Sequence, residues 1–260
     1  MELTESMLFD ENGRCTPADL ENKVHYSTRR YFKFIQPEID YTAIYQRFDN
    51  YLGVSKFIKL DEFEVRAKAI LAKLSKDKSC SNITKGVAVP FILPQESIGD
   101  IGSVFEERYL VSLKKSFEDF FPDYSFVNYC NLSFKGAVSI TPNSRHEELI
   151  EAMQQGVVVG FYFPNLLEYS VPAAIEKVSK LPAQFLLAGG FDSAAAIIGS
   201  PDLLLRKDGY SPLLWLSGMS SDVNNVEYHF EAYGYDLTMN RRAHFSQVAE
   251  YWASGLVVLG

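Results

Sequence analysis

The sequence predicts an α+β fold, in which a helical N-terminal segment precedes a mixed β-sheet with flanking helices. Between Asp40 and Lys76, apolar side chains recur every three or four residues, which is typical of amphipathic helices. After residue 86, apolar runs of strand length mix with amphipathic stretches of helix length. We therefore divide the 260-residue chain into a helical segment, residues 1–80, and an α+β core domain, residues 86–260.

Three helices are expected in the N-terminal segment. Thr16 and Pro17 form a typical helix start, and this first helix is expected to continue to Val24. A second helix is expected to end at Gly53, and a third follows it on the same apolar spacing. The polar stretch from Ser79 to Lys85 then predicts a linker to the core domain.

The core domain is predicted to alternate irregularly between strands and helices. Pro90 and Pro94 place the first strand at an edge of the sheet or make it short, since proline lacks the N–H of a ladder bond. The most apolar runs, residues 185–188 and 213–216, are expected to be neighbouring buried strands. In chain order we expect strands at 86–93, 124–132, 136–140, 157–163, 185–188, 213–216 and 226–235, and helices at 104–121, 146–155, 171–180, from 194 onward, and at 241–252.

Charge and aromatic content constrain the class of partner. The chain carries a formal net charge of -8, and nucleic-acid binding requires clustered Lys and Arg, so the balance argues against a nucleic-acid partner. One local exception is Arg29-Arg-Tyr-Phe-Lys-Phe34, where basic and aromatic residues interleave. Such a stretch can stack on bases, but it is more often an edge strand or a helix turn. The 19 Phe and 15 Tyr residues indicate either a Phe-rich core or an aromatic surface for protein interaction.

The cysteine and histidine patterns predict no disulfide framework and no metal site. Cys15, Cys80 and Cys130 are far apart, and a sparse, odd set is typical of a reducing compartment. The four histidines lack metal-ligand spacing, and we expect neither a metal nor a cofactor. Residues 1–10 lack the apolar region of a secretory signal, and no stretch approaches the roughly 18 apolar residues of a membrane span. We therefore expect a soluble cytoplasmic protein.

The sharpest candidate for a ligand site is the strand-to-helix turn Ala188-Gly-Gly-Phe-Asp-Ser193. It resembles the Ser-Gly-Gly-x-Asp-Ser loop of the ATP pyrophosphatases, a family that adenylates carbonyl groups. In that family the loop holds pyrophosphate on backbone N–H groups at a helix N-terminus. The resemblance implies that Gly189, Gly190, Asp192 and Ser193 bind a nucleotide, although Ala188 stands where the family has its first serine.

The same six residues also fit an ordinary structural turn, with glycine at the bend and Asp192 or Ser193 as the helix cap. A second, looser resemblance concerns the order of short apolar landmarks along the chain, which is similar to that of an uncharacterised bacterial family of unknown function. The landmarks are Val89-Pro-Phe-Ile92, Ile140-Thr-Pro-Asn143, Pro201-Asp-Leu-Leu204 and Pro212-Leu-Leu-Trp-Leu-Ser-Gly218. That family implies no catalytic residues for this chain.

Taken together, the residues favour a non-catalytic binding or assembly module over an enzyme. The chain shows no metal set, no intact nucleotide loop and no nucleophile with an adjacent base, while its aromatic content suits a protein-interaction surface. We expect the partner to be another protein or a second copy of the chain, with no membrane and no nucleic acid. The alternative is a nucleotide-dependent enzyme that uses the loop Gly189–Ser193 for adenylation chemistry.

Overall fold

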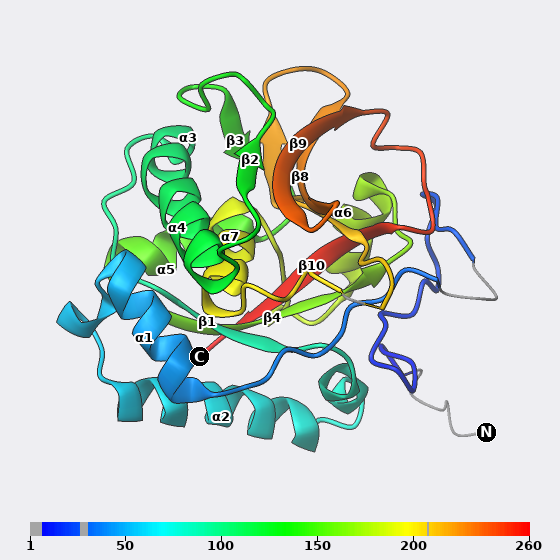
Figure 1. Ribbon diagram of the computed structural model, residues 1–260. Helices are drawn as coiled ribbons and strands as arrows, with labels where there is room; N and C mark the ends of the chain where they lie inside the picture. The colour runs from blue at the N-terminus through cyan, green and yellow to red at the C-terminus, as the bar shows by residue number, and fades with distance from the viewer. Residues whose placement is uncertain (1–6, 27–30, 207) are drawn as a thin grey trace.

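The computed structural model describes residues 7–26, 31–206 and 208–260 and confirms the α+β class (Figure 1). The α-helices are α1 (Tyr41–Leu52), α2 (Leu60–Lys76), α3 (Ile101–Val104), α4 (Val111–Phe120), α5 (His146–Gln155), α6 (Val171–Lys180) and α7 (Gly190–Gly199). The short helical segments are the 3-10 helices η1 (Val54–Lys56) and η2 (Ser81–Lys85) and the π-helical turn η3 (Phe105–Leu110). The strands are β1 (Val89–Leu93), β2 (Phe126–Asn128), β3 (Val138–Ile140), β4 (Val158–Leu167), β5 (Leu186–Leu187), β6 (Leu213–Trp215), β7 (Met219–Ser221), β8 (Val226–Tyr233), β9 (Asp236–Ala243) and β10 (Trp252–Leu259).

The main sheet is mixed and is organised around β10. Its strands follow the order β1-β4-β10-β6-β8-β9-β2, and β5 pairs with β10 beside this path. One edge of β10 pairs with β4, and its other edge pairs with β6 in parallel and with β5 in antiparallel orientation. The two apolar runs predicted to be neighbouring strands are therefore both buried and share one edge of β10. β1 lies at the end of the sheet, as the prolines predicted.

Helix α7 lies inside the protein, and each of its residues is buried. Figure 1 shows it between α4 and the strands β1 and β4. Glycine at both ends of the helix permits this packing, because a Cβ at Gly190 would meet Phe105 and Met219, and one at Gly199 would meet Phe48. The side chains that approach α7 so closely come from α1, η3 and β7, so the helix is enclosed by elements from distant parts of the chain.

The N-terminal helices share one hydrophobic core with the sheet. Ile44 and Phe48 of α1 are fully buried, α1 packs against α7, and α2 packs against β4. The stretch expected to be a linker contains η2, whose Ile83 is buried, and the side chain of Asn82 donates to the carbonyl oxygen of Phe9. Whether residues 1–80 fold independently of residues 86–260 stays a prediction.

Four elements differ from the sequence predictions. The helix expected from residue 194 onward begins at Gly190, so Gly189 is its N-cap residue and Asp192 lies within its first turn. Residues 16–24 form turns and isolated bridges instead of a helix, because Val24 pairs with Tyr169 and the Tyr169 hydroxyl donates to the Cys15 carbonyl oxygen. The expected helix at 241–252 is absent: β9 runs to Ala243, turns follow, and β10 begins at Trp252. The strand expected at 124–132 is limited to β2, since the residues on either side adopt loops.

Gly102 of α3 provides a test of this packing. A Cβ there would overlap the backbone carbonyl group of Phe134, which cannot rotate away, whereas a Cβ at Gly99 would meet nothing within 4 Å. We expect Gly102→Ala to lower the free energy of unfolding by about 1–3 kcal/mol through overpacking. The matched control Gly99→Ala should change it by less than about 0.5 kcal/mol. Urea unfolding measures both, and equal stabilities for the two variants would contradict the placement of α3 against Phe134.

Candidate functional site

The turn singled out by the sequence leads from β5 into α7, so the predicted strand–turn–helix context is present. All four residues that the resemblance implies, namely Gly189, Gly190, Asp192 and Ser193, are buried there. The side chains of Asp192 and Ser193 have no exposed surface. The structure thus brings the four residues together, but it places them inside the core.

Side chains from other elements occupy the space above the two glycines. A Cβ at Gly189 would meet the imidazole ring of His146, the first residue of α5. The backbone N–H of Gly190 points at the sulfur atom of Met219, 3.1 Å away. Glycine is therefore required at both positions by the close approach of neighbouring side chains, which is a packing role.

The carboxylate of Asp192 occupies the N-terminus of its own helix. The backbone N–H of Gly189 donates to both carboxyl oxygens of Asp192, at 2.9 and 3.2 Å, which is one half of a capping box; Gly189 has no side chain to supply the other half. Burial raises the pKa of this carboxyl group to about 8, although the hydrogen bonds from the backbone act in the opposite direction. The backbone N–H of Gly189 is thus engaged by a side chain of the same turn and is not free to bind an anion.

A second buried titratable group, His146, lies against the same turn. Its Nδ1 is 3.2 Å from the carbonyl oxygen of Leu187, and burial lowers the pKa of the ring to about 4. The ring is therefore neutral at pH 7, with Nδ1 as the donor. Its Nε2 is buried and has no hydrogen-bond partner among the described residues. The Ser193 hydroxyl lies 3.5 Å from that of Tyr162 on β4, so the turn is closed by polar groups from three elements.

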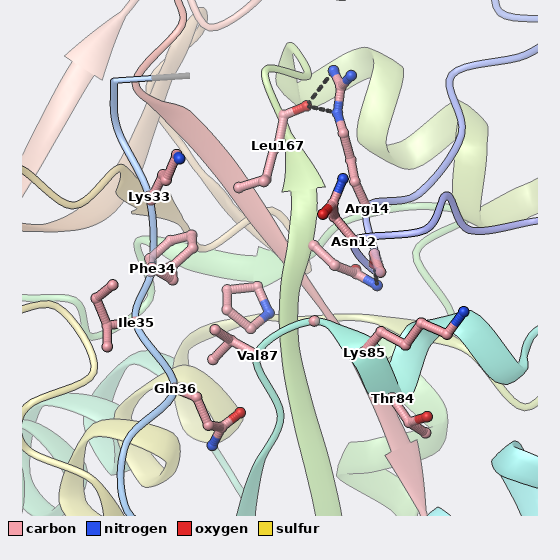
Figure 2. A pocket seen from close by; sticks show the side chains of 14 residues that line it. Asn12, Arg14, Lys33, Phe34, Ile35, Gln36, Thr84, Lys85, Val87 and Leu167 are labelled. Atoms are coloured by element: carbon pink, nitrogen blue, oxygen red, sulfur yellow. Dashed lines mark hydrogen bonds between the residues drawn. The ribbon is translucent and has the colours of Figure 1, made fainter. Parts of the chain in front are cut away.

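An open pocket of about 750 Å³ lies elsewhere, where β1 begins and β4 ends (Figure 2). Pairing between these strands starts at Val89 and Tyr162, so the chain before β1 is free to diverge from β4. Pro164, which lacks an N–H group, lines the pocket at this point. The remaining lining residues come from segments 12–14, 33–36 and 84–87 and from Asn165 and Leu167.

Side-chain hydrogen bonds to the backbone fix the walls of the pocket. The amide of Gln36 accepts from the N–H of Ala88 at 2.8 Å and donates to its carbonyl oxygen at 3.0 Å, as a neighbouring strand would. The amide of Asn165 donates to the carbonyl oxygen of Gly13 at 3.3 Å. Segments that are distant in sequence are thereby held around one cavity.

The pocket lining carries three basic residues and no acidic residue. The guanidinium group of Arg14 is engaged within the protein. It donates to the carbonyl oxygen of Leu167 (Figure 2) and lies 2.8 Å from the Glu168 carboxylate. Lys33 and Lys85 are exposed, and neither takes part in an ion pair within the described part of the chain. The two lysines therefore leave positive charge available on opposite sides of the pocket.

The sequence contained one signal for this pocket. The basic and aromatic stretch Arg29–Phe34 supplies Lys33 and Phe34 to the lining, and its Tyr31 ring lies 5.7 Å from that of Tyr210. Arg29 and Arg30 lie outside the described residues. The other lining segments have no distinctive composition, so only their convergence in space reveals them as one site.

Comparison with known proteins gives no relative for this chain. No family model matches it, and neither a curated protein nor a solved structure matches it. The two resemblances noted in the sequence therefore rest on their own short motifs.

Within residues 7–26, 31–206 and 208–260, no group of three or more His, Cys, Asp or Glu side chains is placed to hold a metal ion. No helix in these ranges is both long and apolar enough to cross a membrane. The open pocket and the buried turn are the two candidate sites.

The buried carboxyl group predicts a pH-dependent stability. The pKa of Asp192 is about 8 in the folded chain against an ordinary value of 3.8, so the folded state binds more protons between these values. Its contribution to stability is full below the lower value and is lost as the pH rises through about 8. Asp192→Asn cannot ionise. When the pH rises from about 6 to about 9, the free energy of unfolding of this variant should fall by about 2 kcal/mol less than that of the parent.

Urea unfolding at several pH values measures this difference. His146 does not interfere, because its pKa of about 4 against an ordinary 6.5 contributes to the pH profile of the parent and of Asp192→Asn alike and cancels in their difference. Asp123→Asn, at an exposed position, serves as the control and should follow the parent. Parallel pH profiles for the parent and Asp192→Asn would contradict a buried, protonated carboxyl group.

Proposed function

We propose that the chain is a non-catalytic binding module that holds a segment of another protein in the open pocket. The observation that carries this proposal is the pocket of about 750 Å³, which lies within the size range of ligand sites and is enclosed by four separate segments. Its lining combines apolar side chains such as Phe34 and Val87 with hydrogen-bonding and charged groups. This combination suits a partner that has both apolar and polar side chains.

Exposed aromatic and aliphatic residues beside the pocket support a protein partner. Ile35, which lines the pocket, is 51% exposed, while Tyr31 and Tyr210 are 59% and 60% exposed. The ring of Phe32 contacts both tyrosines, with centroids 5.3 Å from Tyr31 and 6.3 Å from Tyr210. Tyrosine and phenylalanine are enriched at the centres of protein interfaces, so these residues provide an apolar surface next to the cavity.

The alternative function, adenylation by a nucleotide-dependent enzyme, receives less support. Nucleotide binding at Gly189–Ser193 requires open backbone N–H groups at the start of α7. Here the N–H of Gly189 is bonded to Asp192, that of Gly190 points at Met219, and the turn is buried. Nucleotide binding would require displacement of these side chains, so we favour the binding module.

A cytoplasmic location forms part of the proposal. Cys15, Cys80 and Cys130 are free and buried, and burial raises the pKa of each thiol. Free buried thiols suit a reducing compartment, in which disulfide bonds are rare. A protein partner in the same compartment is consistent with this chemistry.

Selection from a displayed random-peptide library tests the proposal. Asn12→Trp fills the pocket from its exposed rim without changing charge, and Asn224→Trp at an exposed loop position is the matched control. We expect the parent and Asn224→Trp to enrich the same peptides, and Asn12→Trp to lose at least about tenfold in affinity for them. Thermal unfolding should show that both variants are folded.

Two results would overturn the proposal. One is the absence of any enriched peptide, and the other is equal binding by Asn12→Trp and the parent. Light scattering of the parent alone examines self-association; a dimer that Asn12→Trp disrupts would show that a second copy of the chain, and not a different protein, occupies the pocket.

A further inference from the structure

We infer that the segment held in the pocket is an extended acidic peptide, whose carboxylates lie between Lys33 and Lys85. This inference rests on the proposed function and specifies the chemistry of the partner. The chain as a whole carries 33 acidic and 25 basic residues, yet the pocket lining contains Arg14, Lys33 and Lys85 and no acidic residue. Glu168 offsets the charge of Arg14, so Lys33 and Lys85 give the lining a positive charge, opposite in sign to that of the whole molecule. This indicates complementarity to an anionic ligand.

The two lysines are the groups available to bind that anion. Arg14 is nearly buried, and its guanidinium group is held by Glu168 and by the Leu167 carbonyl oxygen. The ammonium groups of Lys33 and Lys85 are engaged by no acidic group or acceptor in the described part of the chain. Figure 2 shows them on opposite walls, so carboxylates of a bound segment would approach one lysine from each side of the cavity.

Apolar groups lie between the two charges. Figure 2 shows Phe34 beside Lys33 and Val87 between that segment and Lys85, and Pro164 also lines the pocket. The exposed side chains of Ile35 and Tyr31 extend this surface beyond the pocket. An occupant that uses both features must carry apolar side chains close to its carboxylates, as a peptide with alternating acidic and apolar residues does.

The backbone beside the pocket favours a peptide over a small anion. Residues 31–35 belong to no helix or strand and alternate in exposure, with Tyr31, Lys33 and Ile35 exposed and Phe32 and Phe34 partly buried. Among the described residues, the backbone N–H and C=O groups of Phe34 and Ile35 have no hydrogen-bond partner. Extended peptides bind such unpaired main-chain groups by adding a strand. A nucleic acid is less suitable, because two free lysines neutralise few phosphates.

Fluorescence anisotropy with labelled hexapeptides tests this inference on the full chain. The probes are an alternating Glu/Leu/Phe peptide, its Gln-substituted counterpart, a phosphoserine-substituted counterpart and a single-stranded RNA hexamer. We expect the acidic peptide to bind at least about tenfold more tightly than the Gln peptide, with an affinity that falls as salt is raised. The phosphopeptide and the RNA should bind more weakly than the acidic peptide.

Variants of the lysines assign the effect to the pocket. Lys33→Gln and Lys85→Gln should each weaken the acidic peptide by about fivefold or more and leave the Gln peptide unchanged. The control Lys135→Gln, at an exposed position outside the lining, should leave both affinities unchanged. This difference between probes separates a charge contact from general damage to the fold, which would weaken both peptides.

The outcomes distinguish this inference from the proposed function. If the Gln peptide binds as tightly as the acidic one, and Asn12→Trp still abolishes binding, the acidic partner is wrong and the binding pocket remains. Preference for the phosphopeptide or the RNA would likewise overturn the carboxylate assignment. If no peptide binds in this assay and the library yields none, both the inference and the proposed function are wrong.

Discussion

A helix with no exposed residue must have both of its ends satisfied by other parts of the protein, and α7 imposes this constraint on the fold. At its start, Asp192 accepts the backbone N–H that precedes the helix. At its end, the side chain of Arg47 in α1 donates to the carbonyl oxygen of Gly199, and Ser116 in α4 donates to that of Ile198. Both donors belong to helices that also supply apolar contacts, so the α1 and α4 positions are set jointly by packing and by these hydrogen bonds.

The sequence allowed prediction of those elements whose pattern is local. The apolar runs that became β5 and β6 could be recognised because length and turn residues agree over a few positions. The helix cap was not recognised, since Asp192 or Ser193 was expected to precede the helix, whereas Gly189 is the N-cap residue and Asp192 lies in the first turn. The helix predicted at residues 241–252 was wrong, because the same apolar spacing is also compatible with the end of one strand and the start of another. Trp252 begins β10 by pairing with Leu213, 39 positions earlier, and periodicity carries no information on such partners.

The same distinction between local pattern and long-range contact applies to the two candidate sites. The glycine turn was visible as a motif, but its accessibility depends on His146 and Met219, which approach from other elements and fill the space above it. The pocket was hardly visible, because the amide of Asn165 joins walls that are 152 positions apart in the chain. Only the stretch that contains Lys33 and Phe34 gave a signal, and its chemistry became meaningful once Lys85 was placed opposite.

The central position of β10 has a consequence for the chain during synthesis. Strands β4, β5 and β6 precede it in sequence, but they become neighbours only through their pairing with residues 252–259. Until those residues leave the ribosome, one edge of β4 stays unpaired, and such an edge is a template for aggregation. The edge of β4 that faces β10 in the folded protein can therefore be closed only after residues 252–259 are available, which makes the pairing of β10 a late step in folding.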